Sequence, residues 1–293
     1  MKRQYHIIGA LSCWGAPICA CDKGPEILQQ SHTIDRLKKH GADITGIEML
    51  RSEYGNKNTD RPPIELALKV LKAFNSALAI AVHRAVQDKK FPIVIGGDHS
   101  VAVGTWNGQE PSFGLIWIDA HMDAHTPETT PSNACHGMPL AALLGFGAPE
   151  MARLLHKEPI IKPQNLALIG IRSFEPEEEA LLKRLGVRMY FMDEVRRRGL
   201  QEILPEAIEH VAKGPKRFGI SLDLDVFSPE ATPGVNTPEK DGIAPQDLLP
   251  LLGAIRHDPR LIGLEIVEYN PMRDVDHKTR DLCYDILQEV TRP

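Results

Sequence analysis

The sequence predicts an α/β fold built on a parallel β-sheet that helices cover on both faces. Eight short apolar runs recur along the chain, and within each run the apolar residues are nearly continuous. Strands buried on both faces have this pattern, whereas half-exposed strands alternate apolar and polar residues. Segments with helical periodicity separate the runs, and alternating strands and helices favour a parallel sheet.

Each expected element follows from its own local pattern. The expected strands lie near residues 5–11, 43–49, 91–96, 113–119, 165–171, 187–191, 217–224 and 261–268. The expected helices span about 25–39, 64–88, 139–156, 175–185, 193–213, 245–257 and 277–290. Pro62-Pro63 suits the start of the long second helix, and Gly186 suits the end of another. No linker, repeat or change of composition divides the chain, so we expect one domain over residues 1–293.

Composition is that of a globular protein, with 42% hydrophobic and 25% charged residues and a formal net charge of −5. This mild acidity gives no reason to expect a nucleic-acid partner. No run approaches the ~18 apolar residues of a membrane span, and the first residues lack a signal-peptide pattern. We therefore expect a cytoplasmic protein with no membrane partner.

The five cysteines do not form an even framework. Cys13, Cys19 and Cys21 share one loop, Cys283 lies in a helical pattern, and Cys135 adjoins His136. A zinc site would need a fourth ligand at suitable spacing, and none is found. Free thiols are therefore expected, and the sequence does not assign them a role.

The segment Asp119-Ala120-His121-Met122-Asp123 follows the apolar run 114–118. If the strand geometry persists, residues at every second position point to the same face, so Asp119, His121 and Asp123 would converge. Unpaired buried charges cost several kcal/mol. A divalent cation would offset that cost.

Two further apolar runs end in residues of the same kind. Asp223 and Asp225 close the run that begins near residue 217, and His99 follows the run 91–96. Ligands bind at the carboxyl ends of the strands in such sheets, where all three clusters fall. Four carboxylates and two imidazoles exceed the needs of one tetrahedral zinc ion. They suit two oxygen-preferring ions, with manganese the natural candidate, whereas Asp98 is expected to be structural.

These motifs resemble the arginase/agmatinase (ureohydrolase) family. The matching segments are Gly96-Gly97-Asp98-His99-Ser100, Asp119-Ala120-His121-Met122-Asp123, His136-Gly137-Met138-Pro139, Ile169-Gly170-Ile171-Arg172, Ser221-Leu222-Asp223-Leu224-Asp225 with Thr232-Pro233-Gly234, and Glu268-Tyr269-Asn270-Pro271. The resemblance runs from about residue 5 to 290. It implies a three-layer α/β/α fold with a mainly parallel eight-stranded sheet, two Mn²⁺ ions per subunit, and a homo-oligomer, usually a trimer or hexamer.

The resemblance also implies roles for the site residues. His99, Asp119, Asp123 and Asp223 would hold one ion, and His121, Asp119, Asp223 and Asp225 the other. A hydroxide that bridges the ions would attack a guanidino carbon. Glu268 would bind the guanidinium, Asp123 would orient the nucleophile, and His136 would pass a proton to the departing amine.

The predicted substrate-binding residues follow an arginase pattern with departures. The segment 126–132, with Thr130 and Ser132, resembles the arginase loop that receives the α-carboxylate of the substrate. His125 stands where arginases have Asn, Ala134 replaces a second Asn, and Glu175 replaces the Asp that contacts the α-amino group. A histidine can still donate to a carboxylate, so His125 and Glu175 remain candidates for the substrate end.

The sequence thus predicts a manganese-dependent hydrolase of a guanidino group, most simply one that converts L-arginine to L-ornithine and urea. An agmatinase, another guanidino-acid hydrolase or a formiminoglutamase remain alternatives within the class, because the departures fall at the substrate end. The single-zinc deacetylases share the fold type but do not need His99, Asp123 and Asp225 together. A catalytically inactive homologue that still binds metal is the non-enzyme alternative, although no expected ligand is missing.

Overall fold

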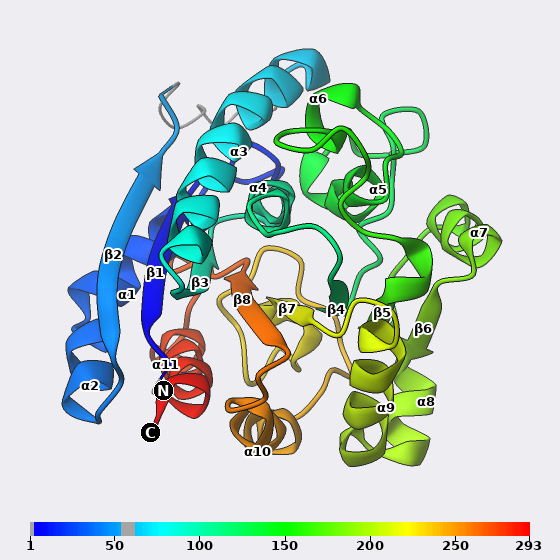
Figure 1. Ribbon diagram of the computed structural model, residues 1–293. Coiled ribbons are helices and arrows are strands. Elements are labelled where there is room, and N and C mark those ends of the chain that lie inside the picture. Colours follow the sequence, from blue (N-terminus) through cyan, green and yellow to red (C-terminus); the bar gives the residue numbers. More distant parts are fainter. Residues whose placement is uncertain (1–2, 54–61) are drawn as a thin grey trace.

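The computed structural model describes residues 3–53 and 62–293. Within them, eight strands form one sheet in the order β2-β1-β3-β8-β7-β4-β5-β6, and neighbouring strands are parallel throughout (Figure 1). The strands are β1 (Tyr5–Leu11), β2 (Ile44–Arg51), β3 (Phe91–Gly96), β4 (Gly114–Ile118), β5 (Leu166–Ile171), β6 (Arg188–Phe191), β7 (Phe218–Asp223) and β8 (Leu261–Val267). The prediction of eight strands at these positions in a parallel sheet is confirmed.

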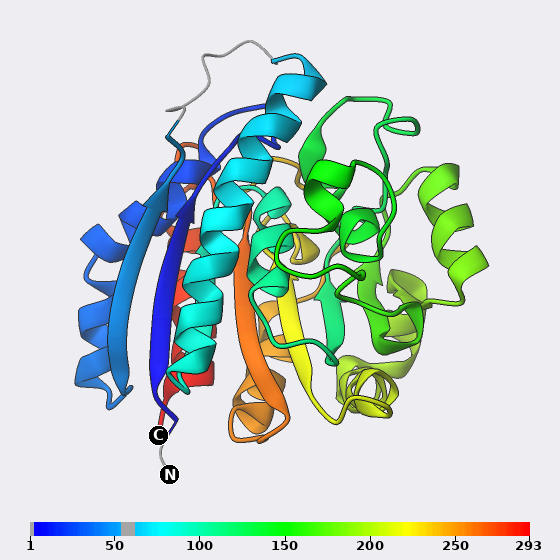
Figure 2. The same cartoon turned by 45° about the horizontal axis from the view of Figure 1, so that its top comes forward.

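Helices cover both faces of the sheet, which gives three layers (Figures 1 and 2). One layer contains α1 (Gly24–Gln30), α2 (Thr33–Lys39), α8 (Met192–Arg198), α9 (Leu200–Ala212), α10 (Pro245–Ile255) and α11 (Lys278–Thr291). The other contains α3 (Ile64–Gln87), α4 (Ala102–Asn107), α5 (Pro139–Leu143), α6 (Pro149–Ala152) and α7 (Pro176–Leu185). In the part of the chain that the structure describes, no helix combines the length and apolar character of a membrane span.

The central strand β4 shows how the sequence builds this arrangement. Ile116 and Ile118 point into the core beneath α9 and α10, whereas Leu115 and Trp117 point into the core beneath α4 and α5. All four side chains are fully buried. Successive side chains of a strand face opposite sides, so only a continuous apolar run can satisfy two cores at once.

Two of the expected helices are interrupted by residues with left-handed backbone. The expected helix 25–39 is α1 and α2, separated at His32, whose φ is 58°. The expected helix 193–213 is α8 and α9, separated at Gly199, whose φ is 83°. A right-handed helix cannot continue through a residue with positive φ. The hydrogen-bonded helix is therefore broken at these two residues, although the apolar residues on both sides keep their helical spacing.

Other differences concern the segment around α5. The expected helix 139–156 forms only α5 and α6, because Gly145 and Gly147 between them have φ values of 88° and 82°. The short helix α4 was not predicted from the sequence. All of its residues are buried, so it lacks the polar face that makes a helix recognisable.

The prediction of free cysteines is wrong for one pair. Cys13 and Cys19, in the loop after β1, form a disulfide with their Cα atoms 5.1 Å apart. Cys21, Cys135 and Cys283 are buried and lie outside this disulfide. The fold brings the first two together by bending the loop, and a disulfide partner is not readable from sequence spacing alone.

Candidate metal centre and adjoining cavity

Histidine and aspartate side chains gather at the carboxyl ends of the central strands. His99 follows β3, Asp119 and His121 follow β4, and Asp223 ends β7, with Asp225 in the 3₁₀ turn η5 (Leu224–Val226) directly after it. In the sheet these strands lie in the order β3-β8-β7-β4. Residues more than a hundred positions apart therefore meet at one edge, as expected for parallel strands.

His99 stands at the centre of the first group. Its Nδ1 lies 3.1 Å from Asp119 Oδ2, 3.0 Å from Asp123 Oδ2 and 3.1 Å from Asp223 Oδ2. None of these contacts has hydrogen-bond geometry, so the buried Nδ1 has no hydrogen-bond partner among the residues that the structure describes. Three carboxylate oxygens around one ring nitrogen repel one another unless protons or a metal ion lie between them.

His121 forms a second group that shares a residue with the first. Its Nδ1 lies 3.1 Å from Asp225 Oδ2 and 3.6 Å from Asp119 Oδ1. Asp119 thus faces His99 with one oxygen and His121 with the other. One ligand atom from each of His99, Asp119 and Asp223 lies within 4.8 Å of the other two, and the same holds for Asp119, His121 and Asp225, the spacing of a metal site. A carboxylate that faces two sites is suited to bridge two ions.

Burial opposes negative charge on the carboxyl groups of this cluster, and the carboxylates in turn favour positive charge on the histidine. Burial, reinforced by neighbouring acids, raises the pKa of Asp223 well above its usual value and that of Asp123 to about 6. Burial would lower the pKa of His99, but the surrounding carboxylates outweigh it and raise that pKa well above the usual value. Protons therefore bind tightly to the cluster, and a divalent cation would replace them.

Two details differ from the expected strand geometry. β4 ends at Ile118, so Asp119, His121 and Asp123 do not converge by strand alternation. They are brought together by an irregular loop in which Asp123 has a left-handed φ of 50°. Hydrogen bonds hold the loop: Asp119 Oδ1 accepts from the His121 backbone N–H at 2.7 Å, and Trp117 Nε1 donates to Asp119 Oδ2 at 2.9 Å. The structure brings the six candidate ligands together, but by a different local structure from the expected strand.

Behind the cluster lies a buried relay that the sequence analysis missed. Ser221 donates its hydroxyl proton to Glu265 Oε2 at 2.6 Å, so His99 Nε2, 2.9 Å from Ser221 Oγ, must be the donor of that contact. This arrangement leaves Nδ1 as the nitrogen that faces the carboxylates. An isolated acid in the apolar strand 261–267 was the signal that could have revealed Glu265.

His136 and Glu268 lie beside the cluster and contact each other. His136 Nδ1 is 3.1 Å from Glu268 Oε1, which also accepts from the backbone N–H of His99 at 2.9 Å. Asn236 Nδ2 donates to Glu268 Oε2 at 3.3 Å. The backbone N–H of His136 donates to the carbonyl oxygen of Gly15 at 3.1 Å, in the loop that the Cys13–Cys19 disulfide closes.

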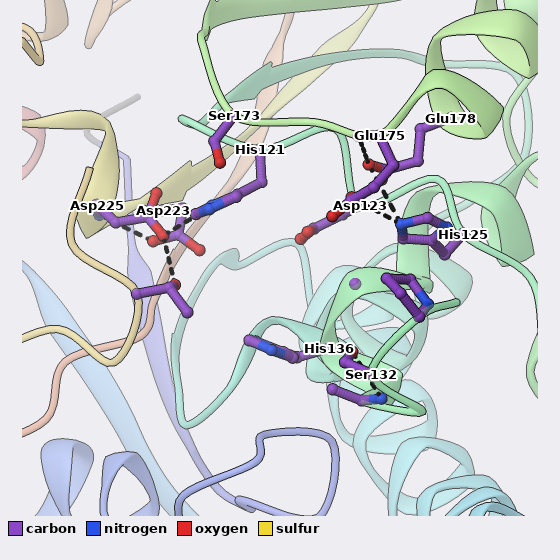
Figure 3. Close-up of a pocket in the computed structure, with 14 residues that line it drawn as sticks. His121, Asp123, His125, Ser132, His136, Ser173, Glu175, Glu178, Asp223 and Asp225 are labelled. Atoms are coloured by element: carbon purple, nitrogen blue, oxygen red, sulfur yellow. Dashed lines mark hydrogen bonds and ion pairs between the residues drawn. The ribbon is translucent and has the colours of Figure 1, made fainter. Parts of the chain in front are cut away.

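A cavity of about 210 Å³ opens beside the cluster (Figure 3). Predicted site residues that line it are His121, Asp123, His125, Ser132, His136, Glu175, Asp223 and Asp225. Thr130 and Glu268 do not line it. Thr130 Oγ1 instead accepts from the backbone N–H of Asn133 at 3.1 Å, and Glu268 is 1% exposed behind His136.

The end of the cavity away from Asp225 holds a second polar group (Figure 3). His125 Nε2 lies 2.9 Å from Glu175 Oε2 and 3.4 Å from Glu178 Oε2. Glu178, which the sequence analysis missed, is buried, and burial raises its pKa to about 8. Glu175 is the N-cap of α7 and Glu178 follows it by three residues, and the two form a capping box. This spacing of two acids at a helix start is the sequence signal that could have identified Glu178.

The whole sequence matches the model of the family described as "Arginase family", over residues 4–292. An arginase of Bacillus caldovelox is 34% identical over 285 residues, covering 96% of this chain and 95% of that protein. An arginase of Bacillus subtilis (strain 168) is 33% identical over 296 residues, covering 99% and 98%.

Solved structures agree. The crystal structure of an arginase from Bacillus subtilis superposes with a TM-score of 0.89 at 32% identity, covering 100% of this chain and 99% of that one. A formimidoylglutamase from Bacillus subtilis has a TM-score of 0.80 at 21% identity, over 99% and 86%. The likeness to the formimidoylglutamase shows a shared fold alone.

Proposed function

The chain belongs to the arginase family, whose members are hydrolases that act on the carbon–nitrogen bonds of linear amidines, and we propose that it hydrolyses L-arginine to L-ornithine and urea. The family is metal-dependent, and the buried His/Asp cluster fits that requirement. The observation that carries the proposal is His99 Nδ1, a buried nitrogen that faces three carboxylates and has no hydrogen-bond partner within residues 3–53 and 62–293.

Two manganese ions are the proposed cofactor. His99, Asp119, Asp123 and Asp223 would hold one ion, and His121, Asp119, Asp223 and Asp225 the other. Carboxylate and imidazole ligands in this proportion suit Mn²⁺. When bound, the pair of ions would lower the pKa of a shared water and supply a strong nucleophile at neutral pH.

The residues of the chain do the remaining work. Asp123 would orient the attacking water. Glu268 would receive the guanidinium cation, which requires the His136 ring to leave its present contact with Glu268 Oε1. His136 would then be free in the cavity to give a proton to the departing amine, a task suited to a group that titrates near neutrality. Substrate entry and the release of His136 are coupled in this scheme, because both cations compete for one carboxylate.

At the other end of the cavity, the amino-acid part of the substrate would lie beside Ser132, Glu175 and His125, with Thr130 behind them. Ser132 lines the cavity, and its Oγ accepts from the backbone N–H of Ala134 at 3.2 Å, which holds the hydroxyl where it would meet a carboxylate. Thr130 Oγ1, 3.4 Å from Ser132 Oγ, supports that hydroxyl.

Urea release tests the proposal. Purified protein supplied with Mn²⁺ should release urea from L-arginine, and Asp119→Ala should release none. Parallel reactions with agmatine and with formiminoglutamate test the other activities of the class. Hydrolysis of either of these without hydrolysis of L-arginine would replace the proposed substrate. Failure of all three would favour an inactive metal-binding homologue.

A homo-oligomer, a trimer or hexamer, is part of the same proposal and rests on the family resemblance alone. Sedimentation velocity of the purified protein would measure its mass against the 32.5 kDa of one chain. A single species at that mass would contradict it.

A further inference from the structure

The cavity has two ends of different chemistry, and the far end is already satisfied by contacts within the protein. The metal cluster lies at one end, and His125, Glu175 and Glu178 lie at the other (Figure 3). A guanidino substrate that reaches from the cluster to this group would place its second polar end there. The contacts of these three residues therefore decide which substituents the cavity accepts.

His125 has no ring nitrogen left for a ligand. Its Nε2 lies 2.9 Å from Glu175 Oε2, and its Nδ1 lies 3.1 Å from Thr129 Oγ1. Thr129 is itself fixed, because its Oγ1 accepts from the backbone N–H of Thr126 at 2.9 Å. The His125 ring is largely shielded from water, since its side chain is only 7% exposed, whereas the Glu175 side chain is 49% exposed.

Glu175 is the acidic group that an ammonium at this end would need, and it is already engaged. One oxygen contacts His125, and its side chain also accepts from the backbone N–H of Glu178 as the N-cap of α7. Glu178 offers no substitute. Its Oε1 accepts from the backbone N–H of Ala124 at 2.9 Å, and its Oε2 accepts from that of Glu175 at 3.0 Å.

We infer that His125 is a specificity-determining residue: by holding Glu175, it weakens recognition of an α-ammonium group, so the site also accepts guanidino acids that lack one. This inference rests on the proposed function, because it concerns the same cavity and the same reaction. The carboxylate of the substrate would still meet Ser132, which lines the cavity. The substrate class is therefore ω-guanidino carboxylates, with or without the α-amino group.

The test compares L-arginine with δ-guanidinovalerate, which is arginine without its α-amino group. The wild type should show kcat/KM values for the two compounds within about tenfold of each other, since the hydrogen bond that would discriminate between them is weakened. His125→Asn has a shorter side chain and should release Glu175, which raises the ratio in favour of L-arginine by roughly ten- to hundredfold, the value of one hydrogen bond to a charged group.

A double-mutant cycle separates this role from general damage to the cavity. Glu175→Gln should change the ratio little in the wild-type background and should abolish the gain in the His125→Asn background. His40→Asn, an exposed histidine, is the matched control and should leave the ratio unchanged.

Binding to the wild type gives a measurement that needs no variant. L-ornithine and δ-aminovalerate are the matching products, and calorimetry should find affinities within about tenfold of each other. An affinity for L-ornithine more than a hundredfold higher, or a kcat/KM ratio that His125→Asn leaves unchanged, would overturn the inference while the proposed function stands. Urea release from neither guanidino compound would overturn both.

Discussion

His136 Nδ1 lies 3.1 Å from Glu268 Oε1, and this contact couples the ionisation of the two residues. Burial would lower the pKa of His136, but the hydrogen bond and charge of Glu268 outweigh it and raise that pKa above its usual value. Burial would raise the pKa of Glu268, and the His136 contact instead holds it below its usual value. In the absence of substrate, protonated His136 is thus the cation that contacts Glu268.

The first prediction concerns the titration of this pair. In Glu268→Gln the pKa of His136 should fall, because its anionic partner is gone. A proton NMR titration of the metal-free protein would measure it, with the other histidine signals as internal controls. An unchanged His136 titration would contradict the ion pair.

The same contact predicts a dependence of stability on pH. The folded pKa of His136 lies above the unfolded value of about 6.5. Its contribution is therefore full below about pH 6.5 and is lost as pH rises through the folded pKa. The contribution of Glu268, whose pKa is lowered, is lost as pH falls through its own folded pKa. Urea denaturation would measure the free energy of unfolding of the wild type and of Glu268→Gln across this range. The difference between the two free energies should narrow at high pH.

The second prediction concerns the catalytic role of His136. His136→Ala should lower turnover by roughly ten- to ten-thousand-fold, the usual range for a positioned acid or base, and leave the bound metal unchanged. Initial rates of urea release and elemental analysis would measure the two effects. His40→Ala, on the surface, is the control. Unaltered turnover in His136→Ala would leave it as a loop residue without a chemical role.

The third prediction concerns the two metal positions. Asp119→Ala should lower manganese content at both, because the oxygens of Asp119 face both histidines. His121→Ala should lower occupancy chiefly at one, because the carboxylates around His99 remain. Equilibrium dialysis against Mn²⁺ followed by elemental analysis gives ions per chain. Two ions in Asp119→Ala would exclude a bridging role.

The fourth prediction concerns the relay behind His99. Ser221→Ala removes the acceptor of the His99 Nε2 proton and one of the donors to the Glu265 carboxylate. Loss of such an outer partner typically lowers metal affinity by about 10- to 100-fold. Calorimetric titration with Mn²⁺ would measure it, and Ser76→Ala, on the exposed face of α3, is the matched control. Equal affinity in the two variants would show that His99 needs no support from Ser221.

The fifth prediction concerns the disulfide loop. Gly15 lies between Cys13 and Cys19, and it donates to Asp98 Oδ2 at 2.9 Å and accepts from the His136 backbone. Cys13→Ser should loosen these supports and lower turnover, with metal content unchanged. Rates measured with and without a reductant, alongside alkylation and mass spectrometry, would follow the pairing. A reductant that cleaves the disulfide without altering the rate would refute this link.

The metal cluster could be predicted from the sequence because each part of it ends an apolar strand. His99, Asp119 and Asp223 are placed by topology, and parallel strands bring their carboxyl ends together whatever the loops do. Glu178 could not be found this way, because an acid in the first turn of a helix is usually exposed. It is buried here because α7 begins against the cavity.

Other features depend on backbone angles that the sequence does not announce. His32 and Asp123 have left-handed φ values of 58° and 50°, although neither is glycine. The first breaks an expected helix, and the second replaces an expected extension of β4. Residues other than glycine uncommonly adopt positive φ, so local propensity alone could not predict either conformation.

The position of β8 determines when the sheet can be completed during synthesis of the chain. β8 is the last strand in the sequence, yet it lies between β3 and β7 and pairs with both. A nascent chain that has already produced His99, Asp119 and Asp223 still has a gap in its sheet, with two open strand edges, until residue 267 leaves the ribosome. Open edges of this kind pair readily with other chains. The two open edges are therefore closed only at the last stage of synthesis, when β8 pairs with β3 and β7.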